Sequence, residues 1–193
     1  MELFKDNLPI IFFENQSTWN VWLKKNHKQT TGLWLKISKK GSGISSVTYY
    51  EALEEALCFG WIDGQKQSYD DKYFLQKFTP RRPRSIWSKV NVEKVASLIA
   101  AEKIQPSGIA AIEAAKADGR WDNAYDSHRT ITISADFQAA LDANAKAKTF
   151  YETLNKTNTY PMLWRIQTAQ KAETRQSYIQ KFISMLENGE KLH

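Results

Sequence analysis

The sequence predicts an α+β fold, with a small antiparallel sheet and packed helices in the N-terminal part and an all-helical C-terminal module. Two observations support this prediction. Short runs in which apolar and polar residues alternate, such as 33–38, occur before residue 80. After residue 91 the apolar residues recur at helical spacing, and capping residues or prolines separate the successive stretches. The two halves of the chain therefore differ in architecture.

The first elements expected are an extended segment, a helix and a strand. Residues 9–13 are apolar and contain a proline, which favours a short extended segment. Ser17 can cap a helix that presents tryptophans and a leucine on one face and ends at Gly32. Residues 33–38 then alternate with the period of a half-buried strand.

A second helix and two more strands are expected next. Thr48 and Glu51 fit a capping box, in which hydroxyl and carboxylate satisfy free amides at the start of a helix, and Gly60 stops that helix. A strand begins at 61–63, and a polar turn leads into another strand at 73–79. These strands complete the expected antiparallel sheet.

The rest of the chain is expected to be helical. The predicted helices begin near or include Asn91, Pro106, Ser134, Ala147, Pro161 and Tyr178. The most polar stretch is 122–132, so a subdomain boundary is placed there. The prediction is a mixed α+β core unit at 1–127 and a helical module at 128–193, packed together as one globular chain.

Composition indicates a folded protein with a moderate excess of positive charge. The chain has 193 residues, 42% of them hydrophobic, and a formal net charge of +6. Its longest apolar run near the N-terminus spans only 8–13, whereas a membrane-spanning helix needs about 20 apolar residues. The flanks of that run are acidic and do not resemble a signal peptide. We therefore expect a cytoplasmic protein without membrane insertion.

The single cysteine and the scattered histidines limit the chemistry. Cys58 is the only cysteine, so no internal disulfide and no multi-cysteine metal site can form. No metal-binding motif or glycine-rich phosphate loop occurs, so neither a metal nor a cofactor is expected. Because none of the three histidines is close to Cys58 in sequence, a buried core thiol is favoured over a nucleophile. No catalytic residue is assigned, and a binding protein is preferred to an enzyme.

The stretch 77–89 is the most distinctive part of the chain. It contains five basic residues and no acid, and two prolines restrict its backbone. Planar guanidinium groups on a restricted backbone suit a carboxylate or phosphate, and a helix start nearby also favours an anion. The candidate ligand-binding residues in and beside this stretch are Trp61, Asp63, Arg81, Arg84, Ser85, Trp87, Ser88, Lys89 and Asn91.

Three interpretations of this basic stretch remain open. The arginines and serines can bind an anionic or polar ligand at the helix start. The arginines beside Trp61 and Trp87 can instead bind single-stranded nucleic acid, with charge for its backbone and rings for its bases. Alternatively, the basic side chains pair with the acidic residues of 51–71 and only connect strands to a helix. Asp63 can orient an arginine of 81–84, can serve as an acid or base, or is a turn residue at the end of a strand.

The sequence resembles the YdeI/OmpD-associated family, also called OmdA-like or bacteriocin-protection proteins. The matching segments are Tyr49–Ala52, Ala56–Gly64, Phe78–Arg81, Ser85, Trp87–Lys89, Asn91, Ala114–Lys116, Gly119, Trp121, Lys171 and Glu173–Arg175. The resemblance extends over nearly the whole chain. It implies a small cytoplasmic bacterial protein of mixed α and β structure that is associated with tolerance to cationic antimicrobial peptides. It supplies no established catalytic activity and no functional residues.

The net charge limits how such a protein could protect a cell. A chain of charge +6 repels cationic peptides over the screening distance of about 8 Å at physiological salt. Any protection is therefore expected to act through an anionic or polar small molecule or through a partner protein. An interaction module acting through the helical C-terminal part, around Trp164 or Tyr178, is the principal alternative to ligand binding at the basic stretch.

Overall fold

The computed structural model describes residues 3–192, which divide into two compact units. The first unit contains the described residues up to Trp87 together with Asn91–Asn123. The second contains Ser88–Val90 and the described residues from Ala124 onward. The α+β class predicted from the sequence is confirmed, since strands occur only in the first unit and the second is helical.

The first unit contains a five-stranded sheet. Its strands are β1 (Leu3–Lys5), β2 (Leu8–Phe12), β3 (Leu33–Ser38), β4 (Trp61–Ser68) and β5 (Tyr73–Pro80), in the spatial order β1-β2-β3-β5-β4. The sheet is not wholly antiparallel as predicted, because β2 and β3 pair in parallel. The connection between them runs through a helix, and a crossover of that kind brings the next strand back in the same direction.

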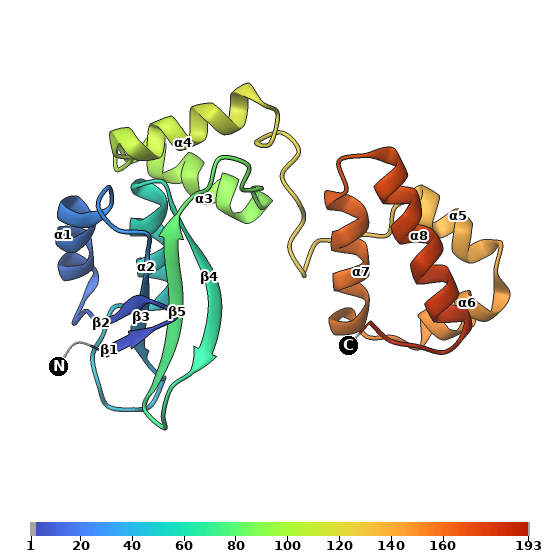
Figure 1. Ribbon diagram of the computed structural model, residues 1–193, viewed down its shortest axis with the longest axis horizontal. Helices are drawn as coiled ribbons and strands as arrows, with labels where there is room; N and C mark the ends of the chain where they lie inside the picture. Colours follow the sequence, from blue (N-terminus) through green and yellow to red (C-terminus); the bar gives the residue numbers. More distant parts are fainter. Residues whose placement is uncertain (1–2, 193) are drawn as a thin grey trace. The chain divides into compact units, whose positions relative to one another are not determined.

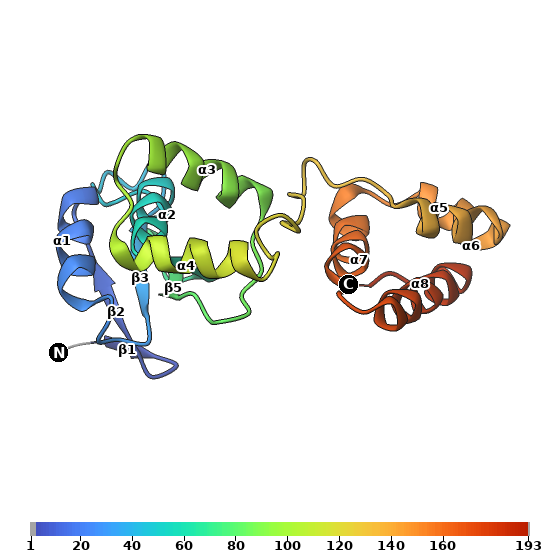
Figure 2. The ribbon, with the colours of Figure 1, turned by 90° about the horizontal axis from the view of Figure 1, so that it is seen from above.

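The helices of this part of the chain are α1 (Gln16–Asn26), α2 (Tyr49–Cys58), α3 (Lys89–Ala100) and α4 (Pro106–Ala117). Figures 1 and 2 show α2 behind the central strands and α1 beside it. The predicted capping box of α2 is confirmed, and Pro106 occupies the first turn of α4 as expected. Two predicted caps are wrong. Asn15, not Ser17, caps α1, and Asn91 lies inside the first turn of α3.

Aromatic rings fill the space between the sheet and α1. The centroid of the buried Trp19 ring lies 5.8 Å from that of Phe78 and 6.3 Å from that of Trp61. Both indoles also donate hydrogen bonds, from Trp19 Nε1 to the Ala52 carbonyl (3.0 Å) and from Trp61 Nε1 to the His27 carbonyl (3.2 Å). Burial of large rings with satisfied N–H groups stabilises this side of the sheet.

Glycines allow α2 and α4 to approach closely. Gly60 adopts a φ of +74° just after α2, a conformation that L side chains rarely adopt. A Cβ on Gly108 of α4 would lie 2.3 Å from the Cys58 carbonyl oxygen. The Gln105 amide donates to the same carbonyl at 2.9 Å. The motif around Cys58–Gly64 therefore contains residues that the packing of these two helices requires.

The second unit is a bundle of α5 (Ala135–Asp142), α6 (Ala145–Glu152), α7 (Lys156–Thr168) and α8 (Ala172–Glu187). Its buried core consists of Phe137, Leu141, Ala147, Met162, Leu163, Ile166, Ile179, Phe182 and Leu186. Pro161 does not open α7 as predicted. Asn155 caps that helix by accepting a hydrogen bond from the Asn158 amide, and Pro161 lies inside it. Among residues 3–192, no helix is both long enough and apolar enough to span a bilayer.

Candidate functional site

A rigid turn presents the arginines of the basic stretch. The Ser85 amide donates to the Arg82 carbonyl at 2.9 Å, which closes a turn over Arg82–Ser85. Pro83 occupies the second position of this turn, where its fixed φ suits the backbone. Residues 81–86 are called the arginine turn below. The turn follows β5 directly, and the Arg81 amide donates to the Gly60 carbonyl at 3.0 Å.

Arg81 supports the arginine turn through its side chain. Its guanidinium carbon lies 3.5 Å from the centroid of the Trp87 ring, and its Nη1 donates to the Ile86 carbonyl at 3.3 Å. Trp87 is 2% exposed, and its ring centroid lies 4.9 Å from that of Trp121. A guanidinium stacked on a buried indole and bonded to the turn is a positioning group, because its orientation is fixed by its neighbours.

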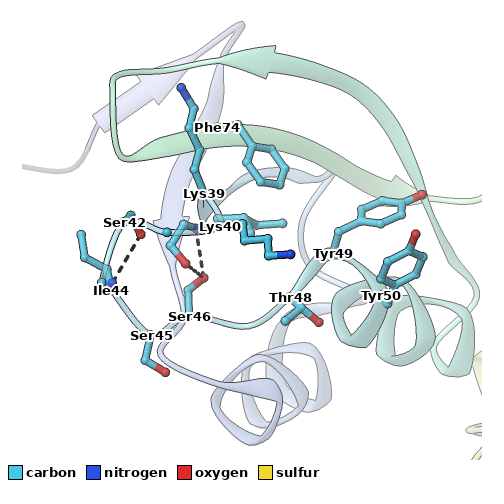
Figure 3. A pocket seen from close by; sticks show the side chains of 14 residues that line it. Lys39, Lys40, Ser42, Ile44, Ser45, Ser46, Thr48, Tyr49, Tyr50 and Phe74 are labelled. Atoms are coloured by element: carbon cyan, nitrogen blue, oxygen red, sulfur yellow. Dashed lines mark hydrogen bonds between the residues drawn. The ribbon is translucent and has the colours of Figure 1, made fainter.

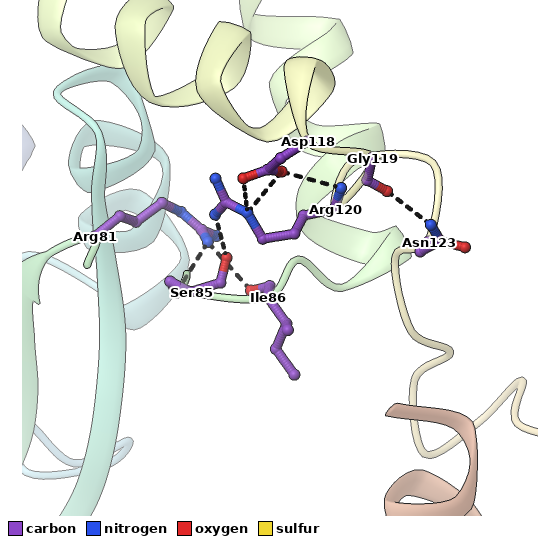
Figure 4. A network of polar contacts seen from close by, with 7 residues as sticks. All are labelled: Arg81, Ser85, Ile86, Asp118, Gly119, Arg120 and Asn123. Atoms are coloured by element: carbon purple, nitrogen blue, oxygen red, sulfur yellow. Dashed lines mark hydrogen bonds and ion pairs between the residues drawn. The ribbon is translucent and has the colours of Figure 1, made fainter. Parts of the chain in front are cut away.

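A second arginine, which the sequence reasoning missed, binds the same turn. Arg120 Nη1 donates to the Ser85 carbonyl at 2.8 Å, and Arg120 Nε forms an ion pair with Asp118 at 2.8 Å. The Arg120 side chain is only 12% exposed. Figure 4 shows Arg81 and Arg120 converging on Ser85 and Ile86 from β5 and from the end of α4. The turn is thus held by two guanidinium groups.

The remaining arginines of the turn are exposed to solvent. Among the described residues, no carboxylate lies within ion-pair distance of Arg82 or Arg84. Arg84 was among the predicted ligand-binding residues, whereas Arg82 was not. The turn therefore presents two exposed guanidinium groups on a backbone that is already ordered.

The structure brings several predicted residues together. Arg81, Ser85 and Trp87 contact one another, directly or through the turn, and Arg84 lies on that turn. Trp61 is 1% exposed and belongs to the aromatic core, so its ring supports the sheet. The role of these residues in binding a ligand stays a prediction.

The other predicted residues occupy different surroundings. Asp63 on β4 accepts a hydrogen bond from the Tyr49 hydroxyl at 2.8 Å. Asn91 is 9% exposed in the first turn of α3. Ser88 and Lys89 group with the second unit, where Ser88 bridges to Tyr125 and Lys89 Nζ forms an ion pair with Asp126 at 2.9 Å. The hydrogen bond from Lys89 lowers the pKa of Asp126 below its ordinary value.

Cys58 is a buried thiol, as expected. It is 3% exposed, and burial, assisted by the negative charge of Glu55, raises the pKa of its thiol to about 12. The thiolate is the reactive form of cysteine, so a thiol in these surroundings is a poor nucleophile at neutral pH. Within residues 3–192, no group of three or more His, Cys, Asp or Glu side chains is placed to hold a metal ion.

A second cationic surface lies at the other end of the β4–β5 ladder. Two adjoining hollows of about 680 and 520 Å³ share Lys39, Lys40 and Phe74 in their walls, and Lys66 completes the second. Neither hollow has an aspartate or glutamate in its wall. Figure 3 shows the first hollow, with Phe74 on one side and the start of α2 on the other. We call this surface the lysine groove; it is not among the sites predicted from the sequence.

One family of known sequences matches the part of the chain that contains both cationic surfaces. Residues 11–111 match a family described as a domain of unknown function, DUF8412, over more than half of the chain. The chain belongs to the DUF8412 family. The DUF8412 match runs from β2 to the first half of α4 and so includes the arginine turn and the lysine groove.

The DUF8412 region is followed by a second match. Residues 130–189 match the family described as bacteriocin-protection, YdeI or OmpD-associated. This finding confirms the family identified from the sequence, and the matched residues lie within the helical unit. The match does not extend over nearly the whole chain as expected, because residues 11–111 match DUF8412 instead. No curated protein and no solved structure matches the chain significantly.

Proposed function

We propose that this protein binds an anionic ligand at the arginine turn, with Arg82 and Arg84 as the contacting residues. The observation that supports the proposal most strongly is that four guanidinium groups at the turn fall into two kinds, two that are bonded to the turn and two that are exposed. Arg81 and Arg120 are bonded to the turn, whereas Arg82 and Arg84 are exposed without an ion-pair partner among residues 3–192. A phosphate or carboxylate group can accept two parallel hydrogen bonds from each exposed guanidinium.

The rigidity of the turn favours binding. Ordering a flexible arginine-bearing loop would cost about 0.5–1.5 kcal/mol for each side chain immobilised, in addition to the cost for the backbone. In this protein the backbone is already ordered by Pro83, by the Ser85–Arg82 hydrogen bond and by the two holding guanidinium groups. Only the side chains of Arg82 and Arg84 remain to be ordered when an anion binds.

Isothermal titration calorimetry with pyrophosphate and with citrate tests this proposal. The wild-type chain is expected to release heat with at least one of these anions. An Arg82→Ala/Arg84→Ala variant should lose this signal, because both contacting forks are removed. A Lys24→Ala/Lys25→Ala variant is the matched control, since it removes the same charge from exposed positions on α1. Equal binding by the two variants, or no binding by the wild type, would show that the proposal is wrong.

Any protective role would follow from this binding indirectly. The second family description names bacteriocin protection, and the chain carries a net charge of +6. Like charge disfavours direct capture of a cationic peptide. We therefore expect the ligand among anionic or polar small molecules, or on a partner protein, in the cytoplasm.

The helical unit supports a second candidate function, recognition of a partner protein. A hollow of about 400 Å³ between α7 and α8 is lined by the half-buried rings of Trp164 and Tyr178 and by basic side chains that include Arg165 and Lys171. Aromatic and arginine side chains are the residues that most often dominate protein interfaces. Under this alternative, Trp164→Ala and Tyr178→Ala would abolish binding of a purified partner, and Arg82→Ala/Arg84→Ala would leave it unchanged.

A further inference from the structure

The lysine groove has the composition of a surface for single-stranded polyanions. Its walls supply the ammonium groups of Lys39, Lys40 and Lys66, and no carboxylate lies within ion-pair distance of them among the described residues. Lys39 Nζ donates to a carbonyl, that of Asp70, at 2.7 Å. The groove therefore keeps three positive charges that no carboxylate in the described part of the first unit neutralises directly.

Three carboxylates near the groove in sequence accept hydrogen bonds from the chain itself. Glu51 accepts hydrogen bonds from the amide and hydroxyl of Thr48, both at 2.8 Å, as part of the capping box. Asp70 accepts from the amides of Lys72 and Tyr73 in the β4–β5 turn. Asp63 accepts from the Tyr49 hydroxyl. These bonds fix three of the nearby carboxylates in structural roles. The exposed Asp71 forms no ion pair with a groove lysine among the described residues, so the lysines stay available to an external anion.

Aromatic rings accompany the charges. Tyr50 is 68% exposed at the rim of the groove, and Phe74 lies in the wall with Lys66 Nζ 4.3 Å from its ring centroid. Figure 3 shows the Tyr49 and Tyr50 rings at the start of α2, across the hollow from the loop that carries Ser42 and Ile44. Rings beside a cationic track are the features on which unpaired bases stack while the lysines contact the backbone.

The loop on the far side leaves the groove open. Gly41 and Gly43 have φ values of +85° and +73°, and no heavy atom beyond each glycine and its two chain neighbours lies within 4 Å of the position that a Cβ would occupy. Their lack of side chains lets the backbone turn sharply and lets a ligand approach it. Because the two hollows share Lys39, Lys40 and Phe74, they can accommodate consecutive units of a chain-like ligand.

From these observations we propose that the lysine groove binds single-stranded nucleic acid without sequence specificity, with Lys40 and Lys66 contacting phosphates and Tyr50 stacking on a base. This site differs from the arginine turn, which lies at the opposite end of the β4–β5 ladder. Free nucleotides share the same chemistry, but the linked hollows and the three charges favour several consecutive phosphates.

Fluorescence anisotropy with a labelled oligothymidylate tests the proposal on the full chain. A Lys40→Ala/Lys66→Ala variant should bind at least about tenfold more weakly. Its plot of log affinity against log salt should be shallower by about 1.4, because each phosphate that a lysine no longer neutralises lowers the slope by about 0.7. The charge-matched control Lys24→Ala/Lys25→Ala should bind like the wild type, within about twofold. Equally weakened binding in the two variants would show only a general charge effect and would overturn the proposal.

Stacking and strandedness have their own tests. Tyr50→Ala should weaken oligothymidylate binding about tenfold, whereas Tyr50→Phe, which retains the ring, should bind like the wild type. Since Tyr50 is exposed, neither substitution is expected to unfold the protein. A duplex of the same length that binds as tightly as the single strand, or ATP that binds more tightly than the oligonucleotide, would contradict the proposed ligand. An unchanged affinity in the Arg82→Ala/Arg84→Ala variant would show that the two sites are independent.

Discussion

The arginine turn and the lysine groove are both cationic, but they use their charges differently. In the turn, Arg81 and Arg120 are bonded to the backbone that they support. In the groove, Lys40 and Lys66 have no hydrogen-bond or ion-pair partner among the described residues, although Lys66 lies over Phe74. The comparison shows that a cluster of basic residues does not identify a binding site until the cations that build the fold are separated from those that remain free.

The largest effect is expected when the Trp87 ring, on which the Arg81 guanidinium lies, is removed. Trp87→Ala deletes a buried indole that contacts Arg81 and Trp121, and it should lower the free energy of unfolding by about 3–5 kcal/mol. Urea unfolding followed by circular dichroism would measure the change. Tyr50→Ala is the control, because it removes an exposed ring and should change stability by less than about 0.5 kcal/mol. If Trp87→Ala lowered the free energy of unfolding only slightly, the Trp87 ring would not support the turn.

The next effect separates the two kinds of arginine. Arg120→Ala leaves the Ser85 carbonyl without its guanidinium donor and should destabilise the first unit by about 1–3 kcal/mol. Arg84→Ala removes an exposed guanidinium and should change stability by less than about 0.5 kcal/mol. Amide hydrogen exchange would detect the difference as faster exchange around Ser85 and the end of α4 in Arg120→Ala alone. Similar exchange rates in both variants would show that Arg120 supports the turn no more than Arg84 does.

A smaller loss of stability is expected in the second unit, where Arg175 is bonded both to a carboxylate and to the backbone. Arg175 binds Asp136 through Nε and Nη2, at 2.6 and 2.8 Å, and its Nη1 donates to the Ile166 carbonyl at 2.7 Å. Hydrogen bonds from Arg175 hold the pKa of Asp136 well below its ordinary value. Because the Asp136 side chain is 44% exposed, solvent screening limits the expected destabilisation in Asp136→Asn to about 1 kcal/mol at neutral pH. Urea unfolding at pH 7 would measure it.

The pH dependence of this pair has a defined sign. A carboxyl group whose pKa is lower in the folded state stabilises the fold fully above its unfolded pKa of about 3.9, and this contribution disappears as the pH falls toward the folded pKa. The stability difference between the wild type and Asp136→Asn should therefore shrink below about pH 4. A difference that grows on acidification would contradict this assignment.

Local sequence signals predicted those features that depend on neighbouring residues. The capping box of Thr48 and Glu51, the stop at Gly60 and the strand at 33–38 were confirmed. The predicted half-buried alternation of that strand is wrong at Trp34, which is buried against Leu8 and Leu75 on the other face of the sheet. The first helix cap was misplaced because several polar residues precede the helix. Ser17 is a good capping residue, but Asn15 and Thr18 form the actual reciprocal pair. Local chemistry allowed either choice, and the structure selects one of them.

The sites depended on proximity that a linear sequence does not reveal. Arg81, Ser85 and Trp87 lie within seven positions of one another and were predicted together. Arg120 reaches Ser85 across 35 positions, and the close packing of α4 against α2 helps to bring it there. The lysine groove likewise joins the loop after β3 to β4 and β5, so no single stretch of sequence contains it.

The most direct measurement is a pyrophosphate titration followed by NMR of the arginine Nε–H resonances. We expect the resonances of Arg82 and Arg84 to move progressively to saturation, while those of Arg81 and Arg120 stay close to their starting positions. Movement confined to Arg81 and Arg120, or equal small shifts of all four, would contradict the division between holding and binding cations.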